Sequence, residues 1–209
     1  MPRTKAATAA TNPTGQAVVI ELPPLKIDTA SITLIGDSEL ISHRWSEKAK
    51  KEIRDKQTKQ AKQARAAKDP EAEYKESLYP YPGGGYGFPA VAFKSAAVDA
   101  CSHIQNVTKV EARGAFHIAG DLVKIEGEPA MREDMVRIGM GVADLRYRGG
   151  FKEWRTTFTI RYNANVISLS QILNLFNTAG FAIGVGEWRP QRDGSSGMFH
   201  VATQQEVEG

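Results

Sequence analysis

Residues 154–162 (WRTTFTIRY) alternate between mostly bulky apolar and polar side chains, and this pattern most constrains the fold. One side of an extended chain collects Trp154, Thr156, Phe158, Ile160 and Tyr162, and the other collects Arg155, Thr157, Thr159 and Arg161. A β-strand places successive side chains on opposite faces. We therefore expect a sheet with one buried face and one face open to solvent.

Two helices are expected to cover the buried face. Residues 89–101 (PAVAFKSAAVDAC) begin with a proline and place small apolar side chains along one side, which suits close packing. The second helix begins after Ser168 or Ser170, which can cap its first turn, and ends at Gly180. Its apolar side consists of Ile172, Leu173, Leu175, Phe176 and Ala179.

Strand-like patterns flank these helices and set the order of the elements. They lie at residues 17–22, 26–35, 112–118, 122–127 and 135–141, with a final pair at 181–188 and 197–203; residues 147–150 indicate a turn. The order is close to βαββαβ. It predicts an α+β fold, a ferredoxin-like or RRM-like antiparallel sheet with two packed helices, a glycine-rich C-terminal loop and a basic helical insertion.

The chain of 209 residues, 41% hydrophobic and 24% charged, is long enough for one substantial domain or two small ones. We expect a single RRM-like domain over residues 17–203. A flexible arm (1–16) precedes it and a tail (204–209) follows it. Within the domain we expect a basic helical insertion at 44–76 and a Gly/Tyr-rich loop at 77–89.

Positive charge is concentrated in residues 44–68, which hold ten basic and three acidic side chains, whereas the rest of the chain is net negative. The segment lacks Gly and Pro and has a thin apolar stripe of Trp45, Ala49 and Ile53, so we expect a helix whose distal half projects. Such a helix suits a polyanion, or it only aids solubility. The phosphate-binding candidates are Arg44, Lys48, Lys51, Arg54, Lys59 and Lys62.

Two further segments carry candidate nucleic-acid contacts. Tyr81 precedes the glycine run and Tyr86 lies within it, between two glycines. Both can stack on unpaired bases, or pin the loop to the body as we expect of Phe88. Near the C-terminus, Gly184, Gly186, Gly194 and Gly197 surround Arg189 and Arg192. These glycines suit either tight turns or a close approach of backbone N–H groups to phosphates. Lys94, in the first expected helix, is a further phosphate candidate.

The sequence does not indicate catalytic or metal chemistry. The four histidines show no paired spacing, and Cys101 alone forms neither an internal disulfide nor a thiolate metal site, so no cofactor is expected. Residues 184–194 (GVGEWRPQRDG) lack the Gly-Lys-Ser/Thr ending of a phosphate-binding P-loop. A lone histidine without a recognisable partner is more often structural than catalytic, and this applies to His43.

Three segments resemble the RAMP superfamily of RRM-like CRISPR proteins, particularly the backbone subunits that polymerise along a guide RNA. They are residues 31–43 (SITLIGDSELISH), the helix at 89–101, and residues 180–201 (GFAIGVGEWRPQRDGSSGMFHV). The resemblance implies a glycine-rich loop between the second helix and the last strand. In this chain Glu187, Trp188 and Asp193 interrupt that loop. The sequence also looks like small proteins of tailed-phage genomes.

These observations lead to three functional hypotheses. The first is a non-catalytic protein that binds single-stranded DNA or RNA with little sequence preference and self-associates into a filament or ring, as in phage replication or recombination. The second is a phage structural or assembly protein whose basic helix docks on a protein partner. The third is a metal-independent ribonuclease that uses His43. No segment has the length and apolarity of a membrane span, so we expect a cytoplasmic protein, in a bacterial host if phage-encoded.

Overall fold

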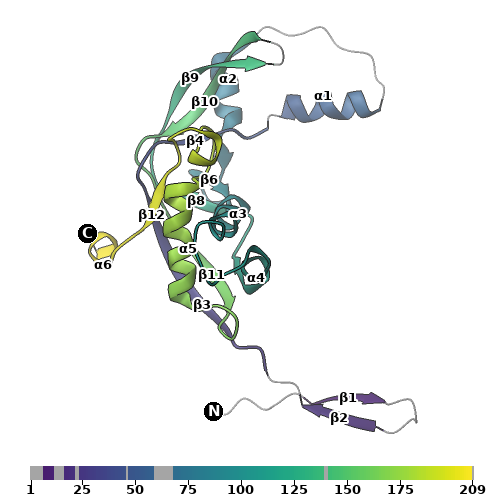
Figure 1. Cartoon of the computed structure of the whole chain (residues 1–209). Helices are drawn as coiled ribbons and strands as arrows, with labels where there is room; N and C mark the ends of the chain where they lie inside the picture. The colour runs from purple at the N-terminus through teal and green to yellow at the C-terminus, as the bar shows by residue number, and fades with distance from the viewer. Residues whose placement is uncertain are drawn as a thin grey trace.

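A four-stranded antiparallel sheet forms the centre of the protein (Figure 1). The computed structural model describes residues 7–11, 17–21, 24–45, 47–58, 68–138 and 141–208. The strand order in the sheet is β12 (Phe199–Val201), β3 (Ile27–Gly36), β11 (Arg155–Asn163) and β7 (Phe116–Ile118). Each neighbouring pair is antiparallel.

Two helices pack on this sheet, α3 (Ala90–Ala100) and α5 (Leu169–Ala182). Along the chain the elements run β3, α3, β7, β11, α5, β12, which is a βαββαβ arrangement in which each helix connects two parallel strands separated by an antiparallel one. The predicted ferredoxin-like α+β fold is therefore confirmed. Ser168 and Gln171 cap α5 reciprocally, as the serine at its start predicted.

Strand β11 has the predicted burial pattern. Thr156, Phe158, Ile160 and Tyr162 are buried, whereas Thr157, Thr159 and Arg161 are exposed. The core against which it packs centres on Phe93 of α3, whose ring centre lies 5.8 Å from that of Phe158 and 5.9 Å from that of Phe199. Cys101 is buried beside this helix, as expected for a small core residue.

A second sheet is formed by β4 (Leu40–Ser42), β10 (Val142–Phe151) and β9 (Pro129–Ile138), in that order. Helix α2 (Pro70–Ser77) packs beside β10, where Ser77 Oγ accepts a hydrogen bond of 2.8 Å from the amide of Gly149. Residues 147–150 lie inside β10, so the predicted turn there is wrong. Its glycines make room for neighbours instead, since a Cβ at Gly149 would lie 2.3 Å from Leu78.

A third, small sheet joins β5 (Tyr79–Pro80), β6 (Tyr86–Pro89) and β8 (Leu122–Ile125). The segment predicted as a loop at 77–89 is therefore a hairpin with a tight turn at residues 81–85. Gly83, Gly84 and Gly85 all have positive φ angles, which explains the glycine run.

The remaining elements include three departures from the predictions. Strand β1 (Ala7–Thr11) lies within residues 1–16, which were expected to be an arm, and it pairs with β2 (Ala17–Glu21), where the sequence predicted a strand. Helix α4 (Lys109–Ala115) occupies most of the strand predicted at 112–118. Residues 181–188 end α5 and enter a loop instead of forming a strand. The other elements are α1 (Glu47–Gln57), η1 (Pro190–Arg192) and α6 (Gln204–Glu208).

None of the helices in the described ranges has the length and apolarity that a membrane crossing requires.

The contact between α5 and β12 depends on a missing side chain at Gly180. A Cβ there would lie 1.6 Å from the carbonyl oxygen of Phe199. We expect Gly180→Ala to lower the free energy of unfolding by about 1–3 kcal/mol, because the strand must move away from the helix. Urea denaturation measures this change.

The control is Gly114→Ala in α4, where no atom lies within 4 Å of the added Cβ. This substitution is expected to stabilise the protein by about 0.4–1 kcal/mol, because alanine restricts the unfolded chain. Equal stability of the Gly180→Ala variant and the parent protein would contradict the role of this contact.

Candidate nucleic-acid interface

The basic helix α1 projects from the body of the protein (Figure 1). Lys51 and Arg54 are exposed on it. The apolar stripe predicted beside them does not join the core, because Trp45 is 59% exposed and Ile53 37%. Lys48 lies in α1, and only its backbone is described; Lys59 and Lys62 lie outside the described residues.

Arg44 lies at the base of this projection. Its amide donates a 2.8 Å hydrogen bond to the carbonyl oxygen of Ser77, and its residue is partly buried. Pro70 begins α2, and the side chain of Asp69 caps this helix by accepting a hydrogen bond from the amide of Ala72. Arg44 therefore connects the projecting helix to the body near α2.

The structure gives the two loop tyrosines different surroundings. Tyr86 packs against the core, with its ring 6.2 Å from that of Phe151 in an edge-on arrangement. Tyr81 closes the hairpin turn, since its amide donates to Gly85 (3.1 Å) and its carbonyl oxygen accepts from Gly84 (3.0 Å). Phe88 is buried, as expected of a residue that pins the segment to the body.

The glycine-rich loop at residues 184–197 is held against the segment before and within β4. The amide of Glu187 donates to the carbonyl oxygen of Ile41 at 3.1 Å, and that of Gly197 donates to Glu39 at 2.8 Å. Gly184 and Gly194 also donate their N–H groups to backbone carbonyls. Three of the four loop glycines (Gly184, Gly194 and Gly197) thus use their amides inside the protein.

The backbone conformation of the loop explains why glycine occupies these four positions. Gly184, Gly186 and Gly197 have φ angles of 67°, 80° and 67°, which disfavour residues with a side chain. Gly194 instead permits a close approach, since its Cβ would lie 1.8 Å from the carbonyl oxygen of Trp188. These features favour the tight-turn interpretation of the glycines.

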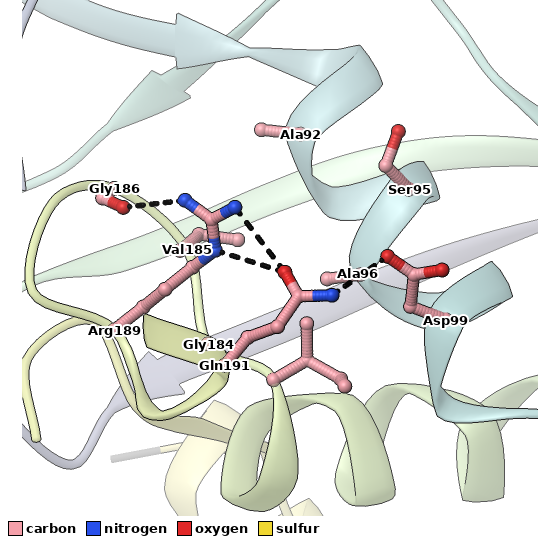
Figure 2. A pocket seen from close by; sticks show the side chains of 10 residues that line it. Ala92, Ser95, Ala96, Asp99, Gly184, Val185, Gly186, Arg189 and Gln191 are labelled. Carbon is pink, nitrogen blue, oxygen red and sulfur yellow. Dashed lines mark hydrogen bonds between the residues drawn. The ribbon is translucent and has the colours of Figure 1, made fainter. Parts of the chain in front are cut away.

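A chain of polar side chains fastens this loop to α3 beside a pocket of about 130 Å³ (Figure 2). Arg189 donates to the carbonyl oxygen of Gly186 (3.0 Å) and to Oε1 of Gln191. Gln191 in turn donates to Asp99 at 3.0 Å. The floor on the α3 side consists of Ala92, Ser95 and Ala96.

Asp99 is the anchor of this chain. Lys109 of α4 donates to its other oxygen at 2.9 Å. The hydrogen bond from Lys109 and that from Gln191 outweigh partial burial and hold the pKa of Asp99 below its usual range. Neither Asp99 nor Gln191 was predicted as a site residue, because no local motif joins positions 92 residues apart.

The other two predicted cations differ in their surroundings. Lys94 lies against α4, with its amine 2.9 Å from the carbonyl oxygen of Arg113 and 5.7 Å from the centre of the Phe116 ring. Burial lowers the pKa of Lys94. Arg192 is exposed at the end of η1. Of the two, Arg192 has the accessibility that a phosphate contact needs.

His43 has a partner that the sequence did not indicate. Its Nδ1 lies 3.0 Å from Oε1 of Glu187, in the glycine-rich loop. The hydrogen bond from His43, together with the charges of Arg148 and Arg189, lowers the pKa of Glu187 against the effect of burial. A carboxylate only accepts, so Nδ1 carries the proton and, in a neutral ring, Nε2 is the basic nitrogen.

The open face of the central sheet is polar. Thr157, Thr159 and Arg161 of β11 lie opposite Thr33, Ser31 and Thr29 of β3, and the hydroxyls of Thr33 and Thr157 are 2.9 Å apart. No aromatic side chain is among these residues. This part of the face therefore lacks the rings with which RRM domains stack bases.

Helix α6 contacts residues at one end of the central sheet. The guanidinium of Arg155 donates to the carbonyl oxygen of Glu206. His200 lies between two carboxylates, 2.6 Å from Asp37 and 3.2 Å from Glu206. Partial burial would lower the pKa of His200, but these two acceptors outweigh it and raise the pKa. Because its guanidinium is bonded to Glu206, Arg155 is engaged within the protein.

Within the described ranges, no three His, Cys, Asp or Glu side chains gather as a metal site would require.

Comparison with known proteins gives a structural likeness only. No protein-family model matches the sequence, and no curated protein matches it. The crystal structure of Cmr6 from Pyrococcus furiosus matches with a TM-score of 0.42 and 9% identity over 86% of this chain and 100% of that chain. The cryo-EM structure of the Type III-B Cmr-beta bound to cognate target RNA matches with a TM-score of 0.47 and 12% identity.

The second match covers 85% of this chain and 60% of that chain, so this chain spans less than two thirds of its length. At these identities and TM-scores we take no activity, ligand or partner from them. We base the fold on the strand order itself.

The side-chain connection to α3 predicts how the glycine-rich loop moves. In an Asp99→Ala variant, Gln191 loses its acceptor, and a hydrogen bond to a charged group contributes about 1.5–3 kcal/mol. We expect amide hydrogen exchange at Gln191, Asp193 and Gly194 to become at least about tenfold faster. Glu76→Ala, which removes an exposed carboxylate from α2, serves as control. Unchanged exchange at these amides would show that the backbone contacts hold the loop without Asp99.

Proposed function

We propose that this protein binds single-stranded nucleic acid with little sequence preference, through the basic helix α1 and the glycine-rich loop. The observation that carries the proposal is that the basic segment 44–68 includes α1, a helix with five basic and three acidic residues that does not contribute to the core. Lys51, Arg54 and the apolar Trp45 and Ile53 beside them are all exposed. A folded domain gains no stability from like charges placed together, and a bound polyanion would supply the compensating charge.

The second contact region is the end of the glycine-rich loop. Arg192 is exposed there, and Arg189 is held in place by Gly186 and Gln191. Cations on a fixed loop lose little conformational freedom when they meet a phosphate. Phosphate groups are the same at every nucleotide, so contacts to them carry no sequence information. We therefore propose little sequence preference.

Self-association along the strand is part of the same proposal. Helix α1 and the hairpin β1–β2 both extend away from the central sheet (Figure 1). Elements of this kind can reach a neighbouring copy bound to the same strand. Light scattering of the protein with and without an oligonucleotide reports the mass of the complex.

The test is the salt dependence of binding to fluorescent oligo-U and oligo-dT, followed by anisotropy. Replacing Lys48, Lys51 and Arg54 with glutamine is expected to weaken binding and to reduce the slope of log K against log salt by about 2, because each phosphate contact to a single strand contributes about 0.7. Comparison of the two oligonucleotides also reports any preference for RNA or DNA.

The control variant removes three charges from separate places, Lys26, Arg137 and Lys152, all of them exposed. It is expected to keep the parent slope, because these cations are not clustered. An equal effect of both triple variants would indicate general electrostatic attraction. No binding to either oligonucleotide at low salt would overturn the proposal and favour a protein partner for α1, as in a virion or assembly component.

Metal-independent cleavage of RNA is a second candidate function, favoured by the contact between His43 and Glu187. With Nδ1 bonded to the carboxylate, Nε2 can take the proton of a ribose 2′-hydroxyl. The 2′-oxygen then attacks the adjacent phosphorus, and the bond from phosphorus to the 5′-oxygen breaks; the 5′-oxygen takes a proton from water, and a 2′,3′-cyclic phosphate remains. Both partners are partly exposed, so a strand can reach them.

This candidate predicts that the parent protein cleaves labelled RNA in the presence of a chelator and that His43→Ala lowers the rate by about 10²–10⁴-fold. Glu187→Gln keeps the shape but removes the charge, and is expected to lower the rate less. RNA with a 2′-deoxy sugar at the cleaved position should resist. Cleavage by the His43→Ala variant at the parent rate would exclude the mechanism, as would intact RNA with the parent protein.

A further inference from the structure

We propose that Trp188 is a platform on which an unpaired base of the bound strand stacks. The inference rests on the proposed function and names a contact within it. Trp188 interrupts the glycine-rich loop between Glu187 and Arg189. Its backbone, its exposure and its charged neighbours each point to a base.

The backbone of Trp188 is strained. Its φ angle is 54°, in the left-handed region that bulky residues rarely adopt. Ser196 donates to its carbonyl oxygen at 2.9 Å, and the amide before it, that of Glu187, is fixed on Ile41. Gly194 lies so close to that carbonyl oxygen that it has no room for a Cβ. The loop therefore holds a conformation that costs free energy, which is common at ligand sites.

The strained backbone does not place the Trp188 side chain in the core. Trp188 is 46% exposed, whereas Trp154 is 3% exposed and donates its indole N–H to the carbonyl oxygen of Ser38 at 2.8 Å. An exposed aromatic side chain by itself is ordinary. In Trp188, however, backbone contacts on both sides hold an unfavourable conformation, and the indole is still exposed. Packing of the core does not explain this combination.

The charges around Trp188 suit a nucleic acid rather than an apolar protein surface. Arg189 follows it directly, and Arg192 is exposed four residues on. The nearby carboxylate of Glu187 is bonded to His43, which reduces its repulsion of a phosphate. An aromatic face beside cations is the arrangement that binds single strands, with the ring on the base and the cations on the backbone.

The aromatic side chains first considered for stacking are less available. Tyr86 packs edge-on against Phe151, and the ring of Tyr81 lies against the backbone of Gly87, where an added Cβ would be 2.9 Å from its Cδ2. The open sheet face carries hydroxyls and Arg161 in place of rings. Trp188 therefore supplies a π-face that these positions do not.

The experiment compares three variants of Trp188 by anisotropy with fluorescent oligo-U. Trp188→Ala is expected to weaken binding by about 5- to 150-fold, the range of one lost base stack, and Trp188→Phe to keep most of the affinity. Trp188→Asn tests the fold, because asparagine tolerates a positive φ. It is expected to unfold no more easily than the parent protein and to bind as weakly as the alanine variant.

Two controls separate the outcomes. Phe181→Ala removes an aromatic side chain that is 76% exposed on α5 and is expected to leave binding unchanged. The salt slope should be the same in all Trp188 variants, because the side chain has no charge. Parent-like affinity of Trp188→Asn, or equal loss in Phe181→Ala, would overturn the inference while the salt-dependent binding of the parent protein still supports the proposed function.

Discussion

The packing of Phe93 holds helix α3 against the central sheet and the small sheet that contains β6. Its ring lies 5.8–6.3 Å from the rings of Phe88, Trp154, Phe158 and Phe199, which come from β6, the β10–β11 turn, β11 and β12. Helix α3 is thereby fixed on the sheet. Because α3 also carries Asp99, the same packing sets the position of the glycine-rich loop. The position of the glycine-rich loop, one part of the candidate interface, depends on an apolar contact that lies on the inner side of that helix.

Burial explains which parts of the fold were predictable from the sequence. The alternation in β11 and the apolar side of α5 both reflect one buried side, and both predictions were correct. Small residues led to wrong predictions where they serve close packing. Gly149 and Gly150 indicated a turn, but they lie in a strand beside Leu78 and Glu39. Helix α4 was missed, although Thr108 and Glu111 form a capping box at its start, because the pattern of residues 112–118 favoured a strand.

The candidate site was less predictable than the fold because its contacts join distant segments. The concentration of charge in residues 44–68 is a local property and was found from the sequence. The bond between His43 and Glu187 spans 144 positions, and that between Gln191 and Asp99 spans 92. No pattern of spacing reveals such pairs. Glu187 and Trp188 were visible only as departures from a glycine-rich loop, and the structure gives each of them specific contacts.

Charged residues in this protein fall into two groups according to their surroundings. In the sheet of β4, β10 and β9, Arg148 and Arg132 form ion pairs with Asp134, and Arg132 also pairs with Glu39; all of these are largely shielded from solvent. Removing one partner from such a pair leaves a charge without compensation, so these residues are needed by the fold. Lys51, Arg54 and Arg192 are exposed and contribute little to stability. A chain that neutralises its buried charges and leaves the exposed ones clustered on a projecting helix places its positive field where a polyanion can reach it.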